Sequence, residues 1–157
     1  MITVLLIIHG LCAVFMLGAL THQVFSVWWP ARAAAGPGQR TLLTSFRAVR
    51  GSAYANTIVI LYVVTASLGA IMYPTYRLAV RVVLEDLRLS AANGMFELKE
   101  HFVALGLGML PAYWYYWRQP PAEAATARRV LTLLLALIVW WAFLVGHILN
   151  NIRGFGS

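Results

Sequence analysis

The sequence has few charged side chains, and acidic ones are especially rare. Of its 157 residues only 11% are charged, whereas 61% are hydrophobic and the mean hydropathy is +0.75. Soluble domains carry about a quarter charged residues, so this shortage excludes an ordinary soluble domain and predicts an integral membrane protein. The length leaves room for a single transmembrane domain over residues 1–157, because four spans of about 20 residues and their loops use up the chain.

Cysteine is almost absent as well. The single residue, Cys12, excludes an internal disulfide, a CxxC redox pair and a cysteine-ligated cluster. The sequence also lacks GxSxG, HExxH, P-loop and dinucleotide-binding patterns. It therefore gives no support for nucleophilic hydrolysis, zinc-dependent proteolysis or phosphoryl transfer. These absences leave an electron-transfer subunit open, so the sequence does not decide whether the protein is an enzyme.

The charge that is present is mostly positive, with a formal net charge of +7. Most of the arginines stand in short segments beside apolar runs, where basic residues set membrane orientation and meet lipid headgroups. We therefore expect the lipid bilayer to be the partner of this charge, and we expect no nucleic acid.

Four long apolar segments follow one another along the chain. Each is long enough for a helix that crosses a bilayer. The sequence predicts an all-α fold, an up-down bundle of four transmembrane helices over about residues 2–29, 53–73, 95–118 and 130–151. Pro74 is expected to end the second helix, and Asn93-Gly94 to form the turn before the third.

The connections between these helices differ in composition. Residues 31–40 and 118–129 are rich in proline, glycine or arginine and are expected to be loops. Residues 41–56 form an amphipathic approach to the second helix. Residues 76–92 mix apolar and charged side chains at helical spacing, which predicts an amphipathic segment at the interface or over the end of the bundle. An ordered connector is the simpler alternative.

The basic residues also orient the predicted bundle. One side carries seven: Arg32, Arg40, Arg47, Arg50, Arg118, Arg128 and Arg129. The other side carries five: Arg77, Arg81, Arg88, Lys99 and Arg153. Because lysine and arginine are enriched in cytoplasmic loops, both termini are expected outside. The excess of arginine over lysine is typical of GC-rich bacterial genomes, so the expected location is a bacterial inner membrane.

Three histidines are expected at one membrane depth. Helices that alternate in direction bring the start of the first, the start of the third and the end of the fourth to one side. His9, His101 and His147 then lie within about two turns of the outer interface, at ~1.5 Å rise per residue. Ionisable residues inside a membrane are costly and often functional. His22 is expected on the opposite side, as a polar cap or a quinone contact.

A haem b held by two imidazoles is the first interpretation. Neighbouring helices lie ~8–10 Å apart, and the diagonal of a square bundle is about 1.4 times that, which matches a haem with two imidazoles. The first and third helices are diagonal, so His9 and His101 are the predicted ligands, with His147 near the haem edge or a quinone. The general architecture looks like that of small four-helix b-type membrane cytochromes, although no family motif is present. Such a protein would pass electrons between quinone and an outer-side partner.

Two other interpretations remain open. One copper or zinc ion could be bound by His9, His101 and His147, with Glu100 as a further ligand or as the carboxylate that fixes an imidazole. Alternatively, the protein binds no cofactor and is an accessory subunit of a larger membrane complex, with other membrane subunits or a second copy as partners.

Glycine and aromatic residues add two weaker indications. Gly10 and Gly18 on the first helix, and Gly106 and Gly108 on the third, could leave room for a flat macrocycle or allow helices to pack closely. The aromatic run at residues 113–117 is interpreted as a belt at headgroup depth, where tyrosine and tryptophan are enriched.

Overall fold

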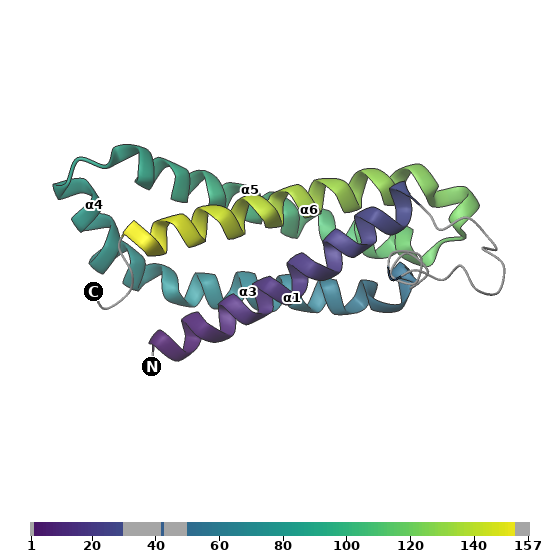
Figure 1. Cartoon of the computed structure of the whole chain (residues 1–157), viewed down its shortest axis with the longest axis horizontal. Coiled ribbons are helices and arrows are strands. Elements are labelled where there is room, and N and C mark those ends of the chain that lie inside the picture. Colours follow the sequence, from purple (N-terminus) through teal and green to yellow (C-terminus); the bar gives the residue numbers. More distant parts are fainter. Residues whose placement is uncertain (1, 30–41, 43–49, 153–157) are drawn as a thin grey trace.

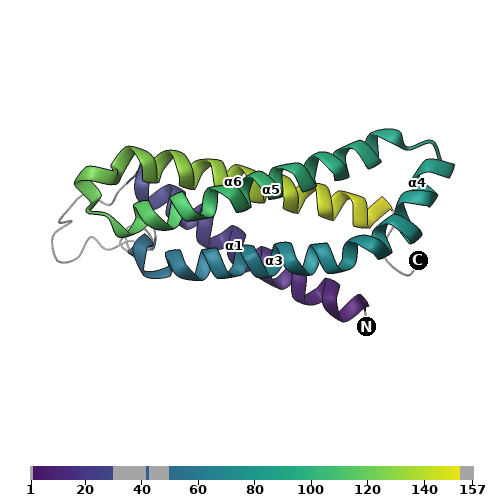
Figure 2. The same cartoon turned by 180° about the vertical axis from the view of Figure 1, so that it is seen from behind.

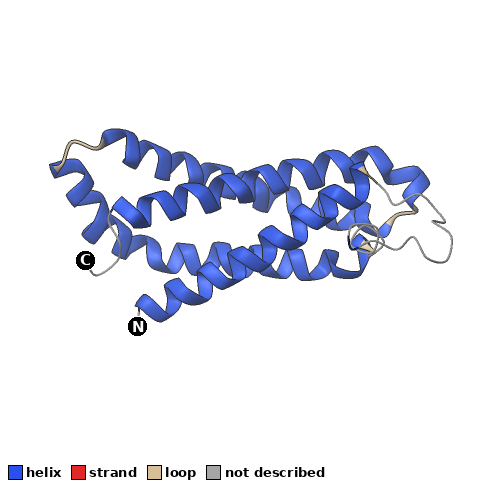
Figure 3. Ribbon diagram, viewed as in Figure 1, coloured by secondary structure: helices blue, strands red, loops and turns tan. Residues whose placement is uncertain are grey.

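The structure is a computed structural model that describes residues 2–29, 42 and 50–152, and within this part every regular element is a helix (Figure 3). Four helices are long: α1 (Ile2–Trp28), α3 (Ala55–Thr75), α5 (Ser90–Arg118) and α6 (Pro121–Ile152). Three are short: the 3-10 turn η1 (Gly51–Tyr54), the π-helical η2 (Tyr76–Arg81) and α4 (Val82–Asp86). The predicted all-α class is therefore confirmed for the described residues.

Among the described residues, three stretches of helix are long and apolar enough to cross a membrane, as an integral membrane protein requires: Ile2–Trp28, Gly51–Asp86 and Pro121–Ile152. Large apolar side chains are widely exposed on them, among them Phe15 at 68% and Ile60 at 61%. Extended apolar surfaces are rare on soluble monomers and mark contact with a membrane or a partner. α5 is less apolar, because its first half carries Glu97, Lys99 and Glu100.

The four long helices lie alongside one another and alternate in direction along the chain (Figures 1 and 2). α1 packs against α3 and α6, and α5 packs against the same two helices, so α1 and α5 lie diagonally across the molecule. The start of α1 and the end of α6 lie at the same end as α4. Towards that end α1 diverges from α6, which separates the two helices there (Figures 1 and 2).

Two predicted helix boundaries are wrong: the end of the second predicted helix and the start of the third. Pro74 does not end the second helix but lies inside α3, which continues through η2 into α4. Helices that cross membranes tolerate an internal proline, and here a π-helical stretch follows at Tyr76–Arg81. The chain turns instead at residues 87–89, where Arg88 has a positive φ of 57°. Asn93-Gly94, predicted as the turn, lies inside α5.

The last helix begins at Pro121 rather than near Val130. Its first residues are rich in alanine, the best helix former, and proline is tolerated in a first turn because its missing N–H has no partner there anyway. The predicted loop is therefore reduced to residues 119–120. The predicted loop at 31–40 and most of the approach at 41–56 lie outside the described residues.

Two groups of buried side chains hold the helices together. The main core lies in the half of the molecule away from α4 and includes the fully buried Leu20, Ile58 and Leu135. A smaller cluster at the α4 end joins Tyr76, Val80 and Leu84 to Val145 and Leu149 of α6. The first three recur every four residues and so share one helix face, whereas the opposite face carries charge. The stretch from η2 to α4 is thus amphipathic and packs on α6.

Candidate functional site

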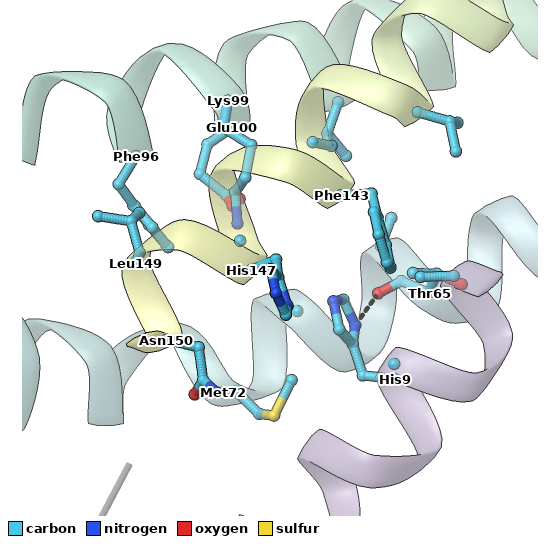
Figure 4. Close-up of a pocket in the computed structure, with 18 of the residues that line it drawn as sticks. His9, Thr65, Met72, Phe96, Lys99, Glu100, Phe143, His147, Leu149 and Asn150 are labelled. Carbon is cyan, nitrogen blue, oxygen red and sulfur yellow. Dashed lines mark hydrogen bonds and ion pairs between the residues drawn. The ribbon is translucent and has the colours of Figure 1, made fainter. Parts of the chain in front are cut away.

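A pocket opens between the helices at the end of the molecule that carries α4. Its volume is about 340 Å³, within the range of small-molecule and cofactor sites. The walls come from α1, α3, η2, α5 and α6 and are largely apolar. Besides tyrosines, its polar lining residues are His9, Thr65, Lys99, Glu100, His147 and Asn150 (Figure 4). We call it the His9–His147 pocket.

His9 enters this pocket from α1 with its ring held in place. Its Nδ1 lies 3.0 Å from the backbone carbonyl oxygen of Thr65 on α3. A carbonyl oxygen can only accept, so this bond requires the proton on Nδ1 and leaves Nε2 with a free lone pair. A hydrogen bond to one ring nitrogen is the way in which proteins orient metal-ligating histidines. His9 therefore has the tautomer of a ligand.

His147 lines the same pocket from α6. Its ring is nearly parallel to that of Phe143, one turn earlier, with an interplanar angle of 6° and centroids 6.3 Å apart. The rings of His9 and His147 both point into the pocket (Figure 4). Two helices thus contribute one imidazole each to a single apolar space.

A pair of opposite charges forms the α5 side of the pocket. Lys99 Nζ lies 2.9 Å from Glu100 Oε1 and 4.1 Å from the ring centroid of Phe96. The Lys99 side chain is only 14% exposed. An ammonium group in such surroundings is stabilised by the carboxylate and by the aromatic face. The pocket is therefore lined by an ion pair as well as by two imidazoles.

His101 does not line this pocket. Its side chain is exposed, and its Nδ1 lies 2.7 Å from the backbone carbonyl oxygen of Glu97 on the preceding turn of α5. The residues of α5 that face the pocket are Phe96, Lys99, Glu100 and Val103, which follow the three- and four-residue spacing of one helix face. His101 is rotated by about 100° from Glu100. The structure therefore brings His9 and His147 together, and not the predicted pair His9 and His101.

The predicted site for one copper or zinc ion is not assembled either. Within the described ranges, no group of three or more His, Cys, Asp and Glu side chains could hold a metal ion. His101 lies on another face of α5, and Glu100 is paired with Lys99. Two imidazoles alone fall short of the three protein ligands that such ions usually take.

A second polar cluster lies at the opposite end of the molecule and is closed. Gln23 is completely buried: its Nε2 donates to the backbone oxygen of Gly51 at 2.7 Å, and its Oε1 accepts from the Tyr113 hydroxyl at 2.5 Å. Beside it, His22 Nδ1 is hydrogen-bonded to the Tyr54 hydroxyl. We call these residues the Gln23 network. His22 fits the predicted polar cap, because it is buried among these groups.

The end of α5 is closed by side chains from α6. Trp117 Nε1 donates to Thr132 Oγ1 at 3.1 Å. The Arg128 guanidinium donates to the backbone oxygens of Tyr116 and Trp117 at 3.0 and 3.2 Å, and also to that of Gln119. Carbonyls in the last turn of a helix have no partner within the helix, so Arg128 supplies one. These contacts are structural.

The aromatic run of α5 is divided between two environments. Tyr113 and Trp117 are 0% and 6% exposed and belong to the main core, whereas residues 114–116 face outward. Residues four apart share a helix face, which explains the division. Of the five residues interpreted as an aromatic belt at headgroup depth, only residues 114–116 have the outward direction that such a belt needs.

The role of Thr65 was missed by the sequence analysis. Its backbone oxygen fixes His9, and its hydroxyl is buried in the pocket wall without a hydrogen-bond partner among the described residues. The only signal was a polar residue in the middle of an apolar run. Lys99, the one lysine of the chain, was counted among the basic residues that orient the bundle but was not predicted as a pocket residue.

Comparisons with known proteins return no match: no family model, no curated protein and no solved structure matches this chain. The fold and the pocket therefore define its class by themselves. It is an all-helical protein over its described residues, with three helices long and apolar enough to cross a membrane. It carries two imidazoles and a Lys–Glu pair in one pocket.

Proposed function

We propose that the protein is a small membrane redox protein, or a subunit of one, that binds one haem b in the His9–His147 pocket. The supporting observation is the pair of imidazoles that α1 and α6 direct into one largely apolar space. His9 is already held with Nε2 free for a ligand bond. Imidazole is a common axial ligand of haem iron, and the pocket around it tunes the reduction potential.

The lining of the pocket suits a flat macrocycle. Gly10 and Gly146 both line it, and a Cβ added at either position would meet no atom within 4 Å. Lys99 donates to Glu100, and because an ammonium group has three N–H donors, it can also donate to a carboxylate of the macrocycle. Haem b supplies one-electron redox chemistry when bound. The chain supplies the imidazoles, excludes water and fixes the local charge.

The proposed ligand pair differs from the one predicted from the sequence. The wide diagonal separation was the reason for pairing His9 with His101. α1 and α6 are neighbours, yet they diverge towards the pocket end (Figure 1), and residues of both helices line the pocket there. His147 thereby takes the place that the sequence analysis gave to His101.

We also propose that α5 crosses the membrane together with the three apolar helices, as a four-helix up-down bundle. α5 packs against α3 and α6, so its polar side chains can face protein instead of lipid. Arg118, Arg128 and Arg129 lie at the end opposite α4, which favours a cytoplasmic position for that end and termini outside, in a bacterial inner membrane. The pocket then lies near the outer interface, within reach of quinone and of an outer-side electron partner.

Visible absorbance tests the haem proposal. The protein, purified in mild detergent from cells with ample haem supply, should show a b-type α band after dithionite reduction. Pyridine haemochrome analysis should give about one haem per chain, as expected for one pocket. His9→Ala and His147→Ala should each lose most of the bound haem, because one imidazole alone holds the iron weakly.

His101→Ala is the matched control, because it removes the same side chain at a similar depth from an exposed position. Its spectrum should equal that of the wild type. A folded, fully expressed wild type without haem would overturn the proposal and favour the cofactor-free accessory subunit. Loss of haem in His101→Ala but not in His147→Ala would overturn the ligand pair.

A further inference from the structure

A shallow groove lies on the outer surface between α3 and α5, in the half of the molecule away from α4. Its volume is about 360 Å³, and its lining residues are all apolar: Val59, Val63, Leu107, Leu110, Pro111 and Trp114. The members on each helix are spaced by three or four residues, so the groove runs along both helix axes. Several of its side chains are well exposed, Val63 at 45% for example. From Leu107 to Trp114 the groove follows α5 for about 10 Å at ~1.5 Å rise per residue, so it has the polarity of an acyl chain and room for a segment of one.

One end of this groove carries a fixed positive charge. Asn56 lies one turn before Val59 on α3, and Arg118 one turn after Trp114 on α5, so both stand at the same end. Asn56 Oδ1 accepts from Trp114 Nε1 at 3.1 Å and from Arg118 Nη2 at 3.4 Å. The Arg118 guanidinium lies 3.8 Å from the ring centroid of Trp114. Trp114 thus belongs to the apolar groove and also supports the cation above it.

The guanidinium of Arg118 has donors to spare. Asn56 takes one of its N–H groups, and none of the ion pairs found in the described part of the chain involves Arg118. Among the described residues, Arg128 and Arg129 also lie at this end, and Glu123 is the one acid there. The local charge therefore favours an anionic ligand. A guanidinium offers a planar fork of donors that matches phosphate oxygens.

We propose that this groove binds an anionic phospholipid, with one acyl chain between α3 and α5 and its phosphate on Arg118. Basic sites between membrane helices on the cytoplasmic side recognise anionic headgroups, and the groove adds contact with the chain. A free phosphate would lack the apolar contact, and a zwitterionic lipid would lack the net charge. The site is independent of the His9–His147 pocket and of the haem proposal.

Native mass spectrometry of the delipidated full chain in detergent tests this site. The protein is titrated with phosphatidylglycerol or phosphatidylcholine of identical chains. Phosphatidylglycerol should bind more tightly to the wild type. Arg118→Gln should weaken its binding about fivefold, the effect expected for one basic residue near a membrane surface. It should weaken phosphatidylcholine binding less, because the choline cation offsets the charge of the phosphate. Glycerol phosphate, which has no chains, should not bind measurably.

Arg77→Gln is the matched control, because it removes the same charge from an exposed site at the other end. It should leave phosphatidylglycerol binding unchanged. A groove-filling variant, Val63→Trp, should weaken the binding of both lipids. Equal weakening by Arg118→Gln and Arg77→Gln would overturn the proposal, because it would mean a diffuse effect of surface charge. Equal affinity of the wild type for both lipids would overturn it as well.

Discussion

The two ends of the molecule use polar side chains in opposite ways. In the Gln23 network the Gln23 amide is buried and is bonded on both sides, by Gly51 and by Tyr113. In the His9–His147 pocket, of the two imidazoles only His9 has a hydrogen bond to another helix in the described part of the chain. Polar groups at the first end hold the chain together. Polar groups at the second end line an open pocket.

The course of α1 explains this difference. Near its end α1 is hydrogen-bonded to α6, by Trp140 Nε1 to Thr21 Oγ1 and by Arg129 Nε to the Val27 oxygen, each at 3.1 Å. Towards its start α1 diverges from α6 (Figure 2), and the pocket occupies the space. Residues that contact a ligand must be held rigidly by the surrounding structure. Here the hydrogen bonds at the closed end hold α1 against α6. Breaking either end separately tests this division.

The largest effect is expected at the closed end, from Gln23→Ala. The substitution removes two hydrogen bonds and leaves the Gly51 oxygen and the Tyr113 hydroxyl buried without a partner. Such a loss costs about 2–4 kcal/mol in the free energy of unfolding. Thermal unfolding in detergent, followed by circular dichroism, measures it. Asn150→Ala in the exposed pocket lining is the control and should change the free energy of unfolding by less than about 0.5 kcal/mol. Similar losses in the free energy of unfolding for both variants would contradict the view that polar side chains stabilise the fold at the closed end only.

A smaller effect is expected at the boundary between the two ends, from Gly106→Ala. Tyr62 lies directly against Gly106, with its hydroxyl donating to the Val103 oxygen at 3.1 Å, so an added methyl group forces the phenol to move. Overpacking of this kind costs about 1–3 kcal/mol. Gly108→Ala is the control, because open space surrounds that position. Equal unfolding temperatures of the two variants would show that the contact with Tyr62 does not make a side chain at position 106 destabilising.

The smallest effect is expected from Arg81→Gln at the surface of the pocket end. Arg81 forms ion pairs with Glu85 and Glu97, at 2.7 and 3.0 Å, and all three side chains reach solvent. Exposed pairs contribute little to stability and are screened by salt. We expect no measurable change in unfolding temperature at either low or high sodium chloride. A clear loss at both salt concentrations would mean that this end, too, depends on a fixed polar network.

Depth along the helices could be predicted from the sequence, but rotation about their axes could not. The position of a residue along a helix follows from a fixed rise per residue, and His9 and His147, which were predicted at one level, line one pocket in the structure. The direction of His101 depends on which face of α5 packs against α3 and α6. That choice is made by the packing of all three helices, so no spacing within α5 could reveal it.

Local turn signals failed where tertiary contacts outweighed them. Asn93 was predicted to turn the chain, yet in the structure it lies inside α5 and its Oδ1 accepts from the Tyr76 hydroxyl at 3.2 Å. Tyr76 in turn stacks on Phe96, with centroids 3.6 Å apart. Contacts with residues that are distant in sequence outweigh weak helix propensities. The local sequence pattern around Asn93 does not predict such contacts.

The short connection between α5 and α6 bears on how the chain enters a bilayer during synthesis. α5 carries Glu97, Lys99 and Glu100 and is a poor candidate for insertion alone. α6 follows after only residues 119–120 and is strongly apolar, so for the proposed four-helix bundle we expect the translocon to release both helices together as one hairpin. The bonds from Arg128 to the last carbonyls of α5 would fasten that hairpin before it joins α1 and α3.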